Sequence, residues 1–285
     1  MEEMNMKKTL VIILAALCLC ACGESSSAAD SSKTEDKNSS AAAVTTTTTT
    51  TSSETTTTTT TTPAETTTTA QTTPPAIKPA SGDVEGRIKW SIDDKGTLTV
   101  TGTGEIPEMS GNEDLWKASS DSIRKAVISE GITKIGLSAF SRSQYLTEVS
   151  IPNTVTEIAD SAFFDCQNLK EITIPDSVQK FGKCVFWRCY GLEKVTVGKG
   201  VKELPYNTFC RCNSLKDVTL SEGLERIGDT SFEYCESLKE LTIPESVKDF
   251  GYCIFPTETN LVLKVKAGSK AEEFAKKYSY KSETY

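Results

Sequence analysis

The C-terminal two thirds of the chain is written in a 23-residue repeat. Phenylalanine, leucine and an aliphatic residue each return at 23-residue steps, so three columns stay in phase over six units. The phenylalanines are Phe140, Phe163, Phe186, Phe209, Phe232 and Phe255. A unit this short cannot bury its own apolar face, so neighbouring units must stack against one another. The repeat therefore predicts a solenoid.

Each unit combines a strand with a tight return. Between Leu169 and Ile174 the apolar residues alternate in the manner of a half-buried strand. Pro175 ends this strand because proline has no amide to donate to a ladder. Val185 and Phe186 then lie in a segment too short for more than one helical turn. The sequence predicts a leucine-rich-repeat solenoid, with a parallel β-sheet on one face and short turns or helical segments on the other.

Two longer phrases carry a family resemblance. Residues 172–182 read ITIPDSVQKFG, residues 241–251 read LTIPESVKDFG, and an Ala-Phe pair precedes Cys166 by the same short spacing that the repeat keeps elsewhere. These phrases resemble units of the bacterial BspA-like (Treponema-pallidum-type) leucine-rich-repeat family, and the resemblance covers about residues 84–285. It implies a surface protein that attaches to ligands on host or neighbouring cells.

Both ends of the repeat array are predicted to be caps. Residues 84–122 contain a hairpin signal around Asp94-Lys95-Gly96, and this β-hairpin would cover the first unit of the repeats at 123–262. Residues 263–285 contain a capping box, Ser269-x-x-Glu272, which predicts a C-terminal helix. Lys264 and Lys266 stand where a 23-residue step would place apolar residues, so we expect the repeat to end before them.

The first 22 residues have the form of a secretory signal segment. Lys7 and Lys8 precede an apolar run from Leu10 to Leu19, which is too short for an ordinary membrane span. The run ends in Leu-Cys-Ala-Cys, which resembles a bacterial lipobox with Cys22 as the acylated residue. The alternative is a plain signal peptide. We expect an extracytoplasmic lipoprotein held at the membrane or cell surface.

Residues 23–83 are rich in Thr, Ser, Ala and Pro, with unbroken threonine at 45–51 and 55–62. With almost nothing apolar to bury, ordering this segment would cost backbone entropy without compensation. The composition predicts a disordered stalk, either a mucin-like glycosylated tether or a passive spacer.

Four cysteines form a further column: Cys166, Cys189, Cys212 and Cys235. Strands about 4.8 Å apart would allow neighbouring pairs to form disulfides, since Cα separations of roughly 4.4–6.8 Å are suitable. Metal binding is a poorer interpretation, because ligands on a line do not make a tetrahedron. The remaining interpretation is a structural ladder of buried thiols.

Two sets of residues are candidates for ligand binding. Phe164 and Trp187 share one column outside the core columns, and Tyr190 follows closely; such rings either bind a sugar or peptide or pack against the next coil. The exposed strand positions alternate in charge, as in a solvated face or a polar gripping surface. The lysines on that face are Lys170, Lys194, Lys216 and Lys239.

Composition disfavours catalysis. The chain has no histidine, and we find no nucleophile–base pair and no metal cluster in the sequence. A net charge of −8 gives no sign of nucleic-acid binding. We expect a monomeric, non-enzymatic binding or adhesion protein without cofactors, displayed on a stalk, with a protein or glycan ligand. The alternative is a structural or polysaccharide-binding module of the bacterial envelope.

Overall fold

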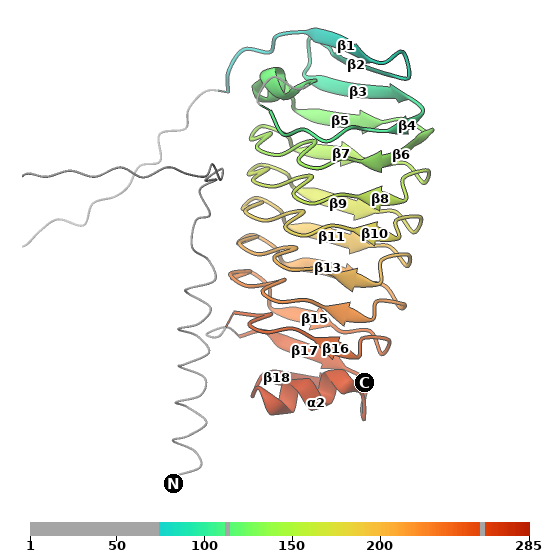
Figure 1. Ribbon diagram of the computed structural model, residues 1–285. Coiled ribbons are helices and arrows are strands. Elements are labelled where there is room, and N and C mark those ends of the chain that lie inside the picture. The colour runs from blue at the N-terminus through green and yellow to red at the C-terminus, as the bar shows by residue number, and fades with distance from the viewer. Residues whose placement is uncertain (1–73, 112–114, 257–259) are drawn as a thin grey trace, which may run out of the picture. The chain divides into compact units, whose positions relative to one another are not determined.

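The computed structural model describes residues 74–111, 115–256 and 260–285. The signal segment with Cys22, and nearly all of the stalk, lie outside the described residues. Within the described residues, short strands follow one another coil after coil and stack along one axis (Figure 1). The predicted leucine-rich-repeat solenoid is thereby confirmed.

Most of the elements are strands of two to six residues. The strands are β1 (Ala80–Val84), β2 (Ile88–Ile92), β3 (Thr97–Gly102), β4 (Gly104–Glu105), β5 (Lys125–Ile128), β6 (Ile132–Ile135), β7 (Glu148–Ser150), β8 (Glu157–Ile158), β9 (Glu171–Ile174), β10 (Lys180–Phe181), β11 (Lys194–Val197), β12 (Glu203–Leu204), β13 (Asp217–Leu220), β14 (Arg226–Ile227), β15 (Glu240–Thr242), β16 (Asp249–Phe250), β17 (Val262–Val265) and β18 (Lys281–Thr284). The helices are the 3-10 helix η1 (Lys117–Ser122) and α2 (Lys270–Lys277).

The main sheet runs in the order β1-β2-β3-β5-β7-β9-β11-β13, and it is parallel from β3 onward. The register advances by one repeat per strand, so Ile172 lies beside Val195, which lies beside Val218. Strands of two to four residues pair on a second side of the coils, in the orders β10-β8-β6-β4 and β12-β14-β16. The strict register places residues of one sequence column side by side.

The third side of each coil is held by backbone hydrogen bonds from the phenylalanine column. The amide of Phe163 donates to the carbonyl of Val185 at 3.0 Å, and the amide of Phe186 donates to the carbonyl of Thr208 at 3.0 Å. The turns on this side require left-handed backbone at two places per coil, such as Ser161 (φ 54°) and Asp165 (φ 58°). That conformation costs about 1–2 kcal/mol per non-glycine residue, and it persists because both neighbouring coils fix it.

The six column phenylalanines are fully or almost fully buried, and their rings stack along the axis of the solenoid. Successive centroids lie 5.1 to 5.7 Å apart, with planes 4° to 27° from parallel. Trp116 continues the stack beyond Phe140, with centroids 5.5 Å apart, and Tyr280 meets Phe255 edge-on at the other end. One aromatic column therefore runs through all the repeats and into both flanking regions.

The cysteine column lies beside this aromatic column, and its four members are buried free thiols. Each thiol donates to the carbonyl of the phenylalanine 26 residues earlier, as Cys189 Sγ does to Phe163 at 3.1 Å. Burial raises the pKa of all four thiols, so they remain protonated. The arrangement corresponds to the thiol-ladder interpretation rather than to disulfides or a metal site.

The N-terminal end is one strand longer than the sequence suggested. The predicted hairpin is present as β2 and β3, and β1 adds a third antiparallel strand from residues assigned above to the stalk. Gly82 allows this addition because a Cβ at that position would lie 2.5 Å from Nε1 of Trp90. This strand was not predicted because the sequence before it is rich in threonine and serine, and because its pairing depends on a glycine, which has no side chain.

At the C-terminal end the strand ladder continues past the point where the repeat was expected to stop. Leu263 of β17 lies beside Leu241 of β15, a step of 22 residues instead of 23, so Lys264 faces outward beside Thr242. This shorter step explains why lysines stood in apolar columns of the sequence. Helix α2 follows, with Ser269 accepting from the amide of Glu272 at 3.2 Å, and β18 adds a last strand.

Substitution of Phe186 by alanine tests the aromatic column. Phe186 is fully buried between two stacked rings. Emptying such a site should lower the free energy of unfolding by about 3–5 kcal/mol, measured by chemical denaturation. The control is Gln179→Ala, an exposed position of the same coil, which should change stability by less than about 0.5 kcal/mol. A Phe186→Ala effect below about 1 kcal/mol would contradict this packing.

Candidate ligand-binding site

Phe164 and Trp187 lie side by side on the turn side of the solenoid. Their ring centroids are 5.3 Å apart and their planes are inclined by 56°. Each follows a column phenylalanine by one residue, so the fold points both rings outward while Phe163 and Phe186 point inward. Both rings are half-buried and keep one part of their surface open.

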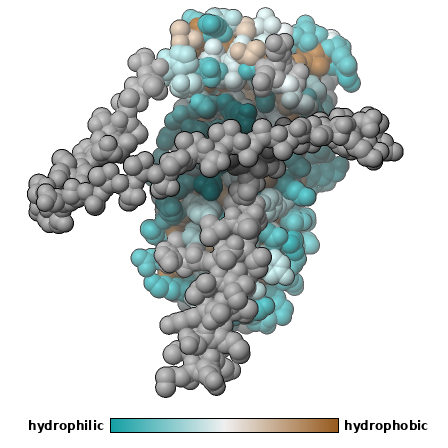
Figure 2. All heavy atoms as spheres, turned by 60° about the vertical axis from the view of Figure 1, so that its left-hand side comes forward, coloured by the Kyte–Doolittle hydropathy of each residue, from teal (hydrophilic) through white to brown (hydrophobic). Residues whose placement is uncertain are grey.

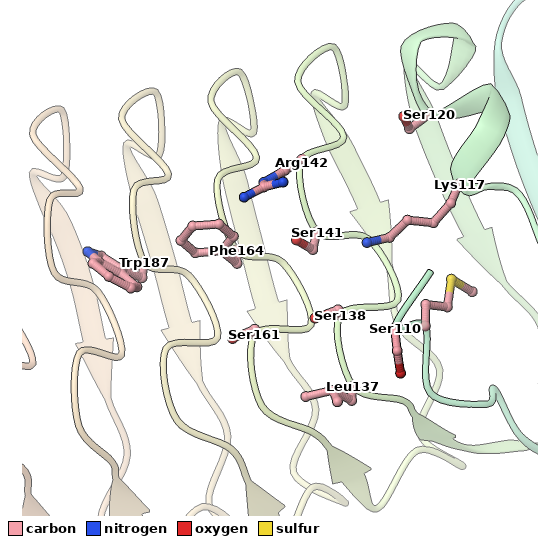
Figure 3. Close-up of a pocket in the computed structure, with 11 residues that line it drawn as sticks. Ser110, Lys117, Ser120, Leu137, Ser138, Ser141, Arg142, Ser161, Phe164 and Trp187 are labelled. Atoms are coloured by element: carbon pink, nitrogen blue, oxygen red, sulfur yellow. The ribbon is translucent and has the colours of Figure 1, made fainter. Parts of the chain in front are cut away.

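The open part of these rings forms one wall of a hollow with a volume of about 520 Å3 (Figure 3). This volume falls within the range of small-ligand sites, roughly 300–1,000 Å3. The hollow is lined by Met109, Ser110, Lys117, Ser120, Leu137, Ser138, Ser141, Arg142, Ser161, Phe164 and Trp187. Three sources meet there: the loop after β4, the helix η1, and the turns of three successive coils.

The five serines of the lining differ from some serines elsewhere in the coils. Ser177 and Ser221 donate their hydroxyls to carbonyls of the preceding coil at 2.7 and 2.6 Å. In the part of the chain that the structure describes, the five lining hydroxyls make no such bond. The hollow therefore presents hydrogen-bonding groups that the fold does not use.

Two basic side chains are among the described lining residues. Arg142 extends over Phe164, with its guanidinium carbon 5.9 Å from the ring centroid, and Lys117 reaches in from η1 toward Ser141 (Figure 3). No carboxylate occurs among the described residues that line the hollow. The carboxylate of Asp165, close by, lies 3.8 Å from Nε of Arg188 and accepts a hydrogen bond from the side-chain amide (Nε2) of Gln167 at 3.1 Å. It therefore interacts with its own neighbours.

Trp187 places an unsatisfied hydrogen-bond donor inside the fold. Its indole N–H is buried and has no hydrogen-bond partner among the described residues, and it lies on the side of the ring away from Phe164 (Figure 3). Leaving a buried donor unsatisfied costs about 1–3 kcal/mol. Phenylalanine would supply the same packing without this penalty. Packing alone therefore does not explain why a tryptophan stands here.

Tyr190, the third predicted aromatic, does not line the hollow. Its hydroxyl lies 3.0 Å from Nε of Arg188, and the guanidinium of Arg188 lies over its ring at 5.9 Å. The structure thus brings together two of the three predicted rings and places the third on a separate Arg–Tyr pair.

All four predicted lysines of the strand face are exposed. Lys194 begins β11 of the main sheet, and Lys170 and Lys216 directly precede its strands β9 and β13, whereas Lys239 precedes β15, which belongs to the separate sheet β15-β17-β18. Lys216 and Lys170 both pair with Glu193, at 2.6 and 3.5 Å, and Lys194 pairs with Asp217 at 3.7 Å. The hydrogen bond from Lys216 lowers the pKa of Glu193. Lys239 donates to the carbonyl of Glu236 at 3.1 Å. Their charges are thus largely balanced by neighbouring coils, as on a solvated face. Exposed ion pairs of this kind contribute little to stability.

Sequence reasoning missed most of the hollow. Ser141 was visible as the member of the Phe164–Trp187 column one coil earlier. Arg142 shares its column and its left-handed backbone (φ 62°) with Arg188 and Arg211, so a comparison of columns does not single it out. Lys117 and Ser110 come from non-repeating segments, for which a column comparison offers no signal.

The surface that contains this side of the coils is mostly hydrophilic where it is visible in Figure 2. A second hollow, of about 390 Å3, lies on the polar face of the N-terminal strands around Ser91 and Thr99. It has no aromatic wall beyond the edge of Trp90. Of the described helices, none is long and apolar enough to cross a membrane.

Comparison with known families gives two matches. Residues 133–262 match the BspA type leucine rich repeat region, in six copies. Residues 6–95 match the New glue protein family, a stretch dominated by threonine, and its biased composition makes that match uninformative about the head. No curated protein is significantly similar to the chain.

Several solved structures are similar. A leucine rich cell surface protein from Faecalibacterium prausnitzii is 24% identical over 66% of this chain and 55% of its own, with a TM-score of 0.49. A leucine-rich repeat protein from Eubacterium ventriosum is 22% identical over 67% of this chain and 73% of its own, with a TM-score of 0.35. The leucine rich repeat protein of T. pallidum is 18% identical over 70% and 97%, with a TM-score of 0.37.

Two substitutions of Trp187 separate packing from an additional role. Trp187→Phe removes the unpartnered donor and should leave the free energy of unfolding unchanged or raise it, because the ring contact with Phe164 is kept. Trp187→Ala should lower it by about 1–3 kcal/mol, less than a fully buried ring would lose. Chemical denaturation measures both. If Trp187→Phe is the more destabilising change, the indole N–H has a stabilising partner and the argument fails.

Proposed function

Because residues 133–262 match the BspA type leucine rich repeat region, we propose that the chain is a non-catalytic binding protein whose head takes its ligand in the hollow beside Phe164 and Trp187. One observation carries the proposal: unused serine hydroxyls, the guanidinium of Arg142 and a costly tryptophan line one hollow. Buried repeats support such a site rigidly, and a rigid support limits the entropy lost on binding.

The composition, the buried thiols and the family matches all favour binding over catalysis. The chain has no histidine, and within the described ranges no three His, Cys, Asp or Glu side chains gather as a metal site would need. The buried thiols of the cysteine column are protonated and inaccessible, which is the opposite of a reactive thiolate. No enzyme family is among the matches.

The proposed place of action is the cell surface. The basic residues, the apolar run and Cys22 in order support export and acylation, and the threonine-rich segment after Cys22 supports a tether that holds the head away from the membrane. In this proposal the protein attaches to a ligand on another cell or on the host. Binding of an envelope polysaccharide is the second candidate, which the hydroxyl-rich lining of the hollow favours.

Capture experiments with the full chain test the location of binding. Material from envelope and host-surface extracts that the native chain captures should be lost with Phe164→Ala plus Trp187→Ala. Interface aromatic residues commonly cost 2 kcal/mol or more on truncation, roughly a 30-fold loss of affinity. The matched control replaces the paired strand-face residues Lys170 and Lys194 by alanine and should keep capture. The reverse result would move the site to the strand face.

Replacement of Cys22 by alanine tests display. Acylated Cys22 should keep the protein in the membrane fraction, and Cys22→Ala should release most of it into the soluble fraction. The expected anchor is the diacyl form, since a single acyl chain holds a protein only marginally. Fractionation followed by immunoblotting measures the ratio, with Cys20→Ala as the neighbouring control. Equal membrane retention of the two variants would contradict lipid attachment at Cys22.

A further inference from the structure

We propose that the ligand of this hollow is a short acidic saccharide, a chain of sugar rings that carries a carboxylate or a sulfate. This inference rests on the proposed function and adds the chemical class of the ligand. Three independent properties of the lining support it: its aromatic wall, its hydroxyls and its charge.

The aromatic wall suits a sugar ring. Phe164 and Trp187 present two flat faces inclined to each other by 56°, with centroids 5.3 Å apart. The apolar C–H face of a pyranose packs against such rings, while its rim remains polar. Only Met109 and Leu137 add aliphatic surface, and Met109 is almost fully buried. The wall therefore has apolar surface for a ring face but not for a purely apolar ligand.

The hydroxyls suit the rim of the sugar. Five serine hydroxyls each donate and accept, and none is used by the described part of the fold. Sugar hydroxyls also donate and accept, so both partners can be satisfied on binding. An apolar ligand would remove water from these serines without replacing its hydrogen bonds, which is unfavourable.

The backbone argues against an extended peptide. Peptides that bind by strand addition need free backbone donors and acceptors. On this side of the solenoid the coils use these groups between themselves. The amides of Phe140, Arg142 and Asp165 donate to the carbonyls of Ala162, Phe164 and Trp187 at 2.8, 2.7 and 2.8 Å. These three amides of the coils are therefore not available for strand addition, and side chains of the coils are left to recognise a ligand, as in a saccharide site.

The charge selects an acidic saccharide over a neutral one. Arg142 lines the hollow, and no carboxylate is among the described lining residues, although the chain as a whole has a net charge of −8. Arg142 is exposed and its backbone lies in a left-handed turn. Its planar guanidinium lies beside the ring of Phe164. Arginine is well suited to bind a carboxylate or sulfate with two parallel hydrogen bonds.

The test measures binding of the full chain to a panel of acidic di- to tetrasaccharides by calorimetry. The panel contains a uronate, a sialylated and a sulfated oligosaccharide, each with its neutral counterpart, such as trigalacturonate and its methyl ester. We expect at least one acidic member to bind about tenfold or more tightly than its neutral counterpart. Arg142→Gln should abolish this preference, and Trp187→Ala should abolish binding of both forms.

Arg211→Gln is the matched control. Arg211 holds the same place in its coil as Arg142, also with left-handed backbone (φ 62°), and stacks over Tyr234 at 4.7 Å, but it does not line the hollow. This variant should bind like the native chain. Thermal melts of all three variants show whether a loss of binding reflects unfolding, and the Trp187→Phe variant covers the case in which Trp187→Ala does not fold.

Four results would overturn the proposal. These are no binding by any member of the panel, equal binding of acidic and neutral forms, loss of binding with Arg211→Gln but not Arg142→Gln, and equally tight binding of a pentaglutamate peptide. If the panel fails while Phe164 and Trp187 remain necessary for capture from extracts, the ligand class is wrong and the proposed function stands. If capture is also independent of both rings, both fail.

Discussion

Each coil of the head can bury its apolar side chains only against the coil before it and the coil after it. The constraint appears in the phenylalanine column, where stacked rings lie beside a ladder of coil-to-coil backbone hydrogen bonds. A fixed step along the chain keeps rings, thiols and amides in register together. Because the column is buried on all sides, it supplies stability in small increments shared between neighbours.

The same periodicity decides what could be predicted from the sequence. The columns of Phe and Leu repeat, so the strands and their parallel order could be inferred from spacing, whereas the spacing of the Cys column left disulfides and a ladder of thiols both open. At both ends of the repeat array the structure differs from the prediction, for local reasons. The strand β1 depends on the absence of a side chain at Gly82, and the step into β17 is one residue short. The glycine leaves no periodic signal, and the short step was interpreted from the misplaced lysines as the end of the repeat.

The hollow illustrates the complementary limit. Phe164 and Trp187 could be found because they interrupt a column that otherwise holds small or polar residues such as Ser141. Their neighbours could not be found this way. Lys117 arrives from η1 and Ser110 from a connecting loop, so their proximity is a property of tertiary structure alone. A repeat protein reveals its framework by regularity, and its specificity lies in the residues that break it.

The hollow is built by the segments from Met109 to Trp187, while intact 23-residue coils continue beyond it. Since every coil contacts only its neighbours, whole units between Cys210 and Phe255 can be gained by duplication or lost by deletion without changing the residues that line the hollow. Evolution can thus lengthen or shorten the head and leave the lining of the hollow intact. The number of coils and the residues that line the hollow can therefore change independently of each other.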